Sequence, residues 1–180
     1  MKAESVAMHI LRLTVTLLAI CALVAAVLSG INMITNDKIA AIQVEKTQTA
    51  IKEVLPEAQN VQQMSLSGEA GIVQAVYTAD DGYAVQVAPN GFDGPVTMMV
   101  GILQGKITGI SVISHTETPG LGAVAATQNA RGEAFRSQFV GQEGALAVGD
   151  QIDAISGATI TSNAVVAGVN AAFDYVANLG

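Results

Sequence analysis

Asp153-Ala154-Ile155-Ser156-Gly157-Ala158-Thr159-Ile160-Thr161-Ser162 lies near the C-terminus and places three small residues directly before a threonine. Small residues let another molecule approach the backbone closely. A helical pattern follows Ser162, and a helix N-terminus offers unpaired N–H groups and a partial positive charge that favour phosphate. The stretch therefore predicts an anion site with an accessible hydroxyl at Thr159. A polar turn that caps the last helix is the simpler alternative, with Thr161 and Ser162 as the cap candidates.

The segments on either side of this stretch predict a rigid support for it. Residues 151–155 resemble a short strand that enters the stretch after a turn at Gly149 and Asp150. Residues 162–178 predict an amphipathic helix, whose packing would fix Thr159 at the edge of a rigid element. The apolar stripe of this helix consists of Val165, Val169, Ala172, Phe173 and Val176.

Earlier in the chain, alternating apolar residues and turn signals predict an antiparallel sheet. Residues 96–103 are apolar on both alternating faces, which predicts a central strand covered on both sides. Residues 123–140 predict one or two helices, broken near Gly132, with Phe135 and Phe139 on one face. We therefore expect an α+β domain with four or five antiparallel strands covered by helices. The other strands are expected at 71–78, 83–88 and 106–114, with tight turns at Asp80-Asp81-Gly82 and Gln104-Gly105.

Composition excludes several classes of function. The chain has a formal net charge of −7, and among its charged residues only Lys2, Glu4 and Arg12 precede residue 37. Nucleic acids and anionic lipid surfaces attract basic patches, so the acidic remainder argues against both as partners. Length leaves room for one domain of ordinary size after an apolar segment is subtracted.

Metal-based redox chemistry is also disfavoured by composition. Cys21 is the only cysteine, and His9 and His115 are the only histidines. The chain can therefore form no internal disulfide, and it lacks the ligands of an iron–sulfur cluster or of a Cys- or His-based zinc site. We expect no metal site, so any redox group must be organic and must come from outside.

Residues 13–36 contain no charged side chain and are long enough to span the roughly 30 Å of a bilayer core. A cleaved signal peptide usually has an apolar core of only about 7–15 residues, and no Ala-x-Ala site closes this one. We therefore predict an uncleaved anchor at residues 1–36, a stalk helix at 37–56 and one domain at 57–180. Basic residues flank the span on both sides, so their count leaves its orientation open.

A second unusual stretch is His115-Thr116-Glu117-Thr118-Pro119-Gly120-Leu121-Gly122. It has no hydrophobic periodicity, and its proline and glycines predict a loop of defined conformation. On its own it would be a strand-to-helix connection. Together with Asp-x-x-Ser-Gly-Ala-Thr at 153–159, it resembles the FMN-binding domain found in the G subunit of Rnf complexes and in the C subunit of sodium-pumping NADH:quinone reductases. The resemblance extends from about Ala50 to the end of the chain.

This resemblance implies that FMN is bound through a phosphoester to Thr159 and is installed by a separate flavin transferase. The stretch contains neither a His nor a Lys that could activate the hydroxyl, which agrees with modification by another enzyme. Asp153 is the implied recognition residue for the transferase. Thr161 and Ser162 are better candidates for helix caps, but they are the rival acceptors if the motif is shifted in register. The implied flavin-binding residues are Ser156, Gly157, Ala158, His115, Glu117, Thr118, Pro119, Gly120, Leu121 and Gly122.

The resemblance further implies an electron carrier without catalytic residues of its own. It would work with other membrane and peripheral subunits to couple ferredoxin–NAD electron transfer to sodium or proton movement. In the family, flavin transfer occurs outside the cytoplasm, which implies a bacterial inner-membrane protein with a cytoplasmic N-terminus. The G type is favoured because the chain is short. A C-type subunit of a quinone reductase, an anchored FMN domain of another electron-transfer chain or regulator, and a ligand-free anchored domain remain alternatives.

Overall fold

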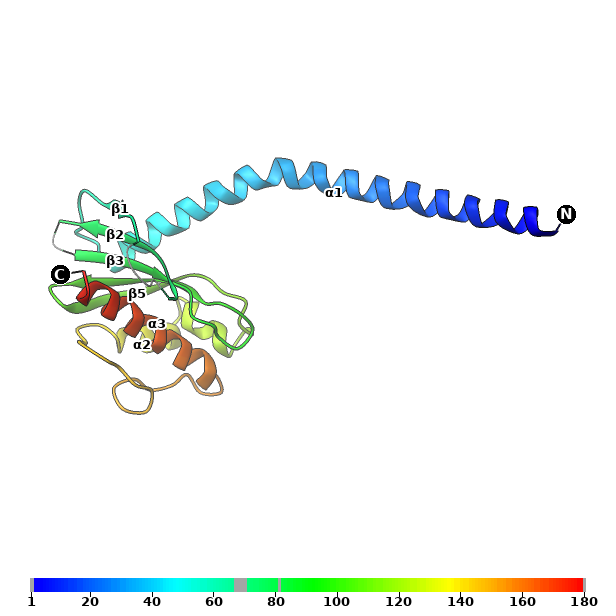
Figure 1. The fold of residues 1–180 in the computed structure, drawn as a ribbon. Coiled ribbons are helices and arrows are strands. Elements are labelled where there is room, and N and C mark those ends of the chain that lie inside the picture. The colour runs from blue at the N-terminus through cyan, green and yellow to red at the C-terminus, as the bar shows by residue number, and fades with distance from the viewer. Residues whose placement is uncertain (1, 67–70, 81, 180) are drawn as a thin grey trace. The chain divides into compact units, whose positions relative to one another are not determined.

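The computed structural model describes residues 2–66, 71–80 and 82–179 of the 180-residue chain, except for the side chains of residues 2–7 and 37. The chain divides into two compact units, Met1–Glu45 and Lys46–Gly180. Helix α1 covers Lys2–Val54 (Figure 1). Its residues up to Glu45 belong to the first unit, and its last turns belong to the second.

Helix α1 is the one helix in the described part of the chain that is long and apolar enough to cross a bilayer. A window of 18 residues within Met8–Val54 reaches a mean hydropathy of 2.5, and none of that window is buried. Large apolar side chains such as Leu17, Leu23 and Leu28 are exposed along it. Such a surface suits contact with lipid or with other apolar helices.

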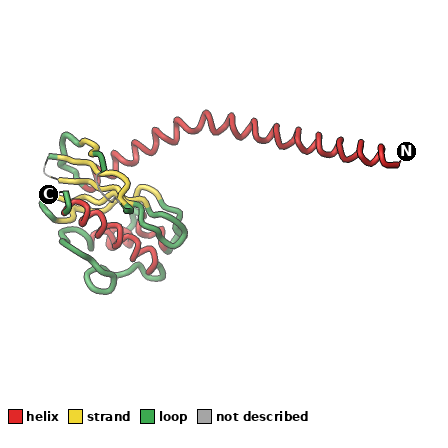
Figure 2. Tube along the Cα trace, viewed as in Figure 1, coloured by secondary structure: helices red, strands yellow, loops and turns green. Residues whose placement is uncertain are grey.

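A five-stranded antiparallel sheet in the order β1-β2-β3-β4-β5 forms the centre of the second unit (Figure 2). This sheet and the helices packed on it confirm the predicted α+β class. β1 was not located in the sequence, because Gln-Gln-Met has no apolar alternation. The strands are β1 Gln62–Met64, β2 Val73–Ala79, β3 Gly82–Val87, β4 Thr97–Leu103 and β5 Lys106–Ser114.

The tight turn between β4 and β5 forms as expected. Gln104 and Gly105, with φ of 51° and 77°, connect β4 to β5 in the left-handed conformation that two-residue hairpins favour. Between β2 and β3, Ala79 pairs with Gly82. Asp81 of the predicted Asp80-Asp81-Gly82 turn lies outside the described residues.

Strand β4 is covered on both faces, which confirms its prediction as a central strand. Met98, Val100 and Ile102 belong to the larger core, which α2 (Ala130–Ser137) and α3 (Thr159–Ala177) help to form. Met99 points to the opposite side and joins a smaller core with Val54 of α1. The sheet therefore lies between the end of α1 on one face and the C-terminal helices on the other.

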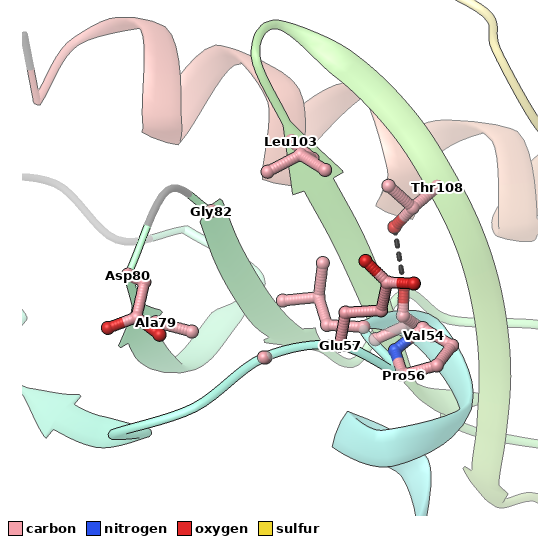
Figure 3. Close-up of a pocket in the computed structure, with 10 residues that line it drawn as sticks. Val54, Pro56, Glu57, Ala79, Asp80, Gly82, Leu103 and Thr108 are labelled. Carbon is pink, nitrogen blue, oxygen red and sulfur yellow. Dashed lines mark hydrogen bonds between the residues drawn. The ribbon is translucent and has the colours of Figure 1, made fainter.

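The last turn of α1 is tied to the sheet by hydrogen bonds as well as by packing. The Thr108 hydroxyl donates to the Val54 carbonyl at 2.6 Å (Figure 3), and the Ser111 hydroxyl donates to a Glu53 carboxylate oxygen at 2.5 Å. Gly101 permits this approach, because a Cβ there would lie 2.7 Å from the Val54 carbonyl oxygen. Beside this contact between α1 and the sheet is a hollow of about 460 Å³, bordered by Leu55, Ala79 and Leu103 among others.

The C-terminal helices differ from the prediction at their boundaries. A 3₁₀ helix, η1, covers Gly122–Ala126, and α2 begins at Ala130 after its N-cap Asn129. Gly132 therefore lies inside α2 and does not break it; the break comes at residues 127–129. Phe135 and Phe139 are both buried in an edge-to-face pair with ring centroids 5.5 Å apart, as expected for one face.

Helix α3 begins at Thr159, three residues before the predicted start, and Ala158 is its N-cap. Its predicted apolar stripe is correct, since Val165, Val169 and Ala172 are fully buried. The strand expected at residues 151–155 does not form, and Ile152 makes only an isolated bridge to Val148.

Candidate functional site

Thr159 is the first residue of α3 and its side chain is exposed. The turn before it closes through a hydrogen bond from Ala158 N to Ile155 O at 2.9 Å, with Gly157 at a φ of 78° that suits glycine. The N-cap residue supplies no side-chain hydrogen bond. Within the described chain, no acceptor is recorded for the first three N–H groups of α3, so these donors and the Thr159 hydroxyl lie together at the helix N-terminus.

The two other hydroxyls in the first turn of α3 are buried, which corrects their prediction as helix caps. Thr161 is 1% exposed, and its hydroxyl donates to Glu117 Oε2 at 2.7 Å. Ser162 is fully buried; its hydroxyl donates to Ala158 O at 3.0 Å and accepts from Ile155 N at 2.9 Å. Both residues lie inside the first turn of α3. Thr159 is therefore the accessible hydroxyl of the three.

Glu117 is a buried carboxylate, 5% exposed, at the centre of the predicted loop. Its Oε1 accepts hydrogen bonds from the backbone N–H of Phe92 at 2.7 Å and of Asp93 at 3.3 Å. Its Oε2 accepts the hydroxyl of Thr161. One side chain thus joins three segments that are far apart in the sequence.

A hollow of about 340 Å³ opens beside Thr159. Its lining is mainly apolar and includes three large side chains with unusual exposure: Phe92 at 68%, Ile160 at 56% and Leu121 at 45%. Among the described residues, Glu117 is the only charged one in the lining, and no Lys, Arg or His contributes to it. Such a surface offers apolar walls to a ring system rather than a site for a free anion.

The structure brings only some of the predicted site residues to this hollow. Pro119 and Gly120 belong to the predicted loop but do not line the hollow, and neither does His115 after the end of β5, whose Nδ1 is buried without a hydrogen-bond partner among the described residues. The predicted residues that do line it are Glu117, Thr118, Leu121, Gly122, Gly157, Ala158 and Thr159.

Three lining residues were absent from the predicted flavin-binding set: Phe92, Ile160 and Thr161. Phe92 lies in an irregular connection without periodicity, where an aromatic residue among turn-forming neighbours was the only available signal. Ile160 follows the predicted attachment residue directly. Its exposure became clear only when α3 was seen to begin at Thr159.

Asp153 and Ser156 lie along a different hollow, of about 470 Å³, which Arg131 and Gln138 also border. Both polar atoms of the Gln138 side chain engage the Asp153 backbone: Oε1 accepts from the N–H at 2.7 Å, and Nε2 donates to the carbonyl at 3.4 Å. This pairing replaces the strand contacts that residues 151–155 lack, and it leaves the Asp153 side chain exposed.

Comparison with known proteins places this region in a family context. Residues 91–174 match the model of the FMN-binding domain family. The G subunit of the ion-translocating oxidoreductase complex of Methanosarcina acetivorans is 34% identical over 179 residues, covering 93% of this chain and 95% of that protein. The G subunit of the Na⁺-translocating ferredoxin:NAD⁺ oxidoreductase complex of Acetobacterium woodii is 32% identical over 192 residues, covering 94% and 93%. The G subunit of the proton-translocating ferredoxin:NAD⁺ oxidoreductase complex of Clostridium ljungdahlii is 39% identical over 102 residues, covering 52% of each chain.

Proposed function

Because this chain belongs to the family of G subunits of Rnf-type ion-translocating oxidoreductase complexes, we propose that it carries FMN covalently on Thr159. Membership makes it an electron-transport subunit, with an FMN-binding domain, of a multi-subunit complex. The covalent bond, the membrane anchor and the ferredoxin–NAD coupling to sodium or proton movement are parts of the proposal. When bound, FMN supplies the electron-transfer chemistry.

One observation supports attachment of FMN at Thr159. Its hydroxyl is exposed at a helix N-terminus whose first N–H groups have no acceptor within the described chain, directly beside a hollow with apolar walls. A phosphoryl group on this oxygen would meet the donors of α3, and the ring would reach Phe92, Leu121 and Ile160. The described lining has no basic residue to hold a free phosphate. A covalent bond to Thr159 would hold the phosphate in place of such a residue. The residues present therefore fit FMN.

The proposal is tested by the intact mass of the chain after expression with a flavin transferase. In this step the Thr159 oxygen loses its proton and bonds to the flavin phosphate of a flavin nucleotide donor, whose bond from that phosphate to its leaving group breaks. We therefore expect the mass to rise by that of FMN less one water, and the denatured protein to keep flavin fluorescence. A bare-chain mass under these conditions would contradict the proposal.

A separate transferase is proposed because the site does not activate its own nucleophile. Glu117 is the one carboxylate among the described residues that line the hollow, and it binds Thr161 rather than Thr159. An alcohol needs an adjacent base or a metal to become nucleophilic. We propose that the transferase recognises the exposed Asp153, which Gln138 holds in place.

Replacing Gln138 with alanine is expected to raise the transferase KM for this chain severalfold with little change in kcat. The substitution removes both contacts to the Asp153 backbone, and it leaves Thr159 untouched. Initial rates of flavin incorporation at several chain concentrations would measure this. Ser137→Ala, at the exposed neighbouring position, is the control and should behave as wild type. An unchanged KM for Gln138→Ala would exclude this role.

We also propose that α1 anchors the chain in the bacterial inner membrane with the FMN domain outside the cytoplasm. Cys21 is the only cysteine, so a Cys21→Ala chain can carry a single reporter thiol at the exposed position 137. With Ser137→Cys, a membrane-impermeant maleimide is expected to label intact spheroplasts as fully as lysed cells. Labelling only after lysis would place the domain in the cytoplasm.

A further inference from the structure

Glu117 is unusual because it is a buried carboxylate whose recorded partners are all neutral donors. Its three hydrogen bonds come from two backbone N–H groups and one hydroxyl. Burying a carboxylate is costly unless hydrogen bonds compensate for lost water. The loop at residues 92–93 and Thr161 of α3 therefore stabilise the buried Glu117 carboxylate. Glu117 in turn holds both segments through the same hydrogen bonds.

The surrounding backbone is shaped to fit this carboxylate. A Cβ added at Gly91 would overlap Glu117 Oε1, and a Cβ at Gly122 would overlap Glu117 Oε2. The Gly122 Cβ would also lie 2.5 Å from Thr161 Oγ1. Glycine at these positions allows the chain to close around the carboxylate from two directions, so the contacts form a packed junction rather than a surface pair.

The segments joined by this junction also supply the walls of the hollow. The loop held through Oε1 carries Phe92, and the helix turn held through Oε2 carries Thr159 and Ile160. Leu121 lies in the same loop as Glu117 itself. Glu117 therefore links all three walls to the attachment hydroxyl, and the Thr116 hydroxyl, which donates to Asp93 O, adds a second contact to the Phe92 loop.

We propose that Glu117 is a positioning residue that assembles the flavin site before any flavin is attached. It holds the Phe92 loop against the first turn of α3, and it keeps the Thr161 hydroxyl buried so that Thr159, rather than Thr161, is offered for modification. This inference rests on the proposed function, and it assigns Glu117 a role in the flavin-free chain rather than contact with the flavin alone.

The experiment compares Glu117→Ala, Glu117→Gln and Thr161→Val with wild type, in the full chain, with Glu133→Gln as a control at an exposed carboxylate. Glutamine keeps an acceptor for the Phe92 and Asp93 N–H groups, and its amide can donate to the Thr161 oxygen. It should therefore restore most of the junction, whereas alanine removes all three contacts and Thr161→Val removes one.

The first readout needs no flavin. In the unmodified chain, amide hydrogen exchange at Phe92 and Asp93 is expected to accelerate at least about tenfold in Glu117→Ala, and little in Glu117→Gln or Glu133→Gln. The second readout is flavin incorporation, in which Glu117→Ala is expected to lose about tenfold in kcat/KM because the acceptor is misplaced. Peptide mapping of the modified variant should detect some flavin on Thr161.

Distinct results would overturn the inference. Wild-type exchange and wild-type incorporation in a folded Glu117→Ala chain would show that the junction positions nothing. If Glu117→Ala does not fold, Thr161→Val provides the test, and it is expected to reduce flavin incorporation by less than the tenfold expected for Glu117→Ala. Wild-type incorporation in Thr161→Val would then overturn the inference. A Glu117→Gln chain as impaired as Glu117→Ala would indicate a need for charge rather than position. Failure of the proposed function would appear differently, as a wild-type chain that never gains flavin mass.

Discussion

Thr159→Val is expected to abolish covalent flavin completely, so that the chain keeps its bare mass and its denatured form shows no flavin fluorescence. Valine matches threonine in shape but lacks the hydroxyl oxygen that would form the bond. Because Thr159 is exposed and its side chain has no recorded hydrogen bond within the described chain, the free energy of unfolding should change by less than about 0.5 kcal/mol. The two measurements together separate loss of attachment from loss of fold.

Two matched variants make this result specific. Thr159→Ser keeps an oxygen at the same place and should retain at least partial incorporation. Thr161→Ser keeps the buried hydroxyl that donates to Glu117, so it should be modified at Thr159 as in wild type. Flavin mass on the Thr159→Val chain, mapped to residue 161 or 162, would show that attachment occurs elsewhere in this stretch.

Gly132→Ala is expected to destabilise the second unit by about 2–3 kcal/mol, although alanine normally stabilises a helix interior relative to glycine by about 1 kcal/mol. A Cβ at this position would overlap the Thr127 carbonyl oxygen and would lie 2.6 Å from that of Val124. The Thr127 carbonyl also accepts a hydrogen bond from Arg136 Nη1 at 2.7 Å, so it cannot move away without breaking that contact. Backbone crowding therefore outweighs helix propensity here.

Chemical denaturation of the chain in detergent would measure this effect. Arg131→Ala is the control, because it changes an exposed residue in the same helical turn and should shift the unfolding free energy by no more than about 0.5 kcal/mol. A Gly132→Ala chain as stable as wild type would mean that η1 can move away from α2 at no cost.

Much of the fold was predictable because it depends on local pattern. Residues 96–103 have apolar side chains on both faces, and a strand with that pattern needs cover on both sides, as β4 has. The apolar stripe around Val165 and Val169 likewise predicted the buried face of α3. β1 escaped prediction because Gln62–Met64 joins the sheet edge through backbone pairing, which leaves no apolar signature.

The start of α3 could not be predicted, because the residue types that usually cap a helix lie inside its first turn and not before it. Thr161 and Ser162 are typical cap types, yet their hydroxyls bind Glu117 and the turn at Ile155. Their partners are distant in sequence or depend on the fold of that turn. The junction at Glu117 was hidden for the same reason, since its contacts join segments 24 to 44 residues apart.

The attachment of α1 to the sheet has a consequence for how neighbouring proteins of the complex can approach. Residues 50–55 occupy one face of the sheet, where Thr108 and Ser111 bind the last turn, whereas α3, which begins at Thr159, belongs to the opposite side. This end of α1 therefore does not cover the exposed surface around Thr159. That surface stays open to a neighbouring protein of the complex without any change in how residues 50–55 pack on the sheet.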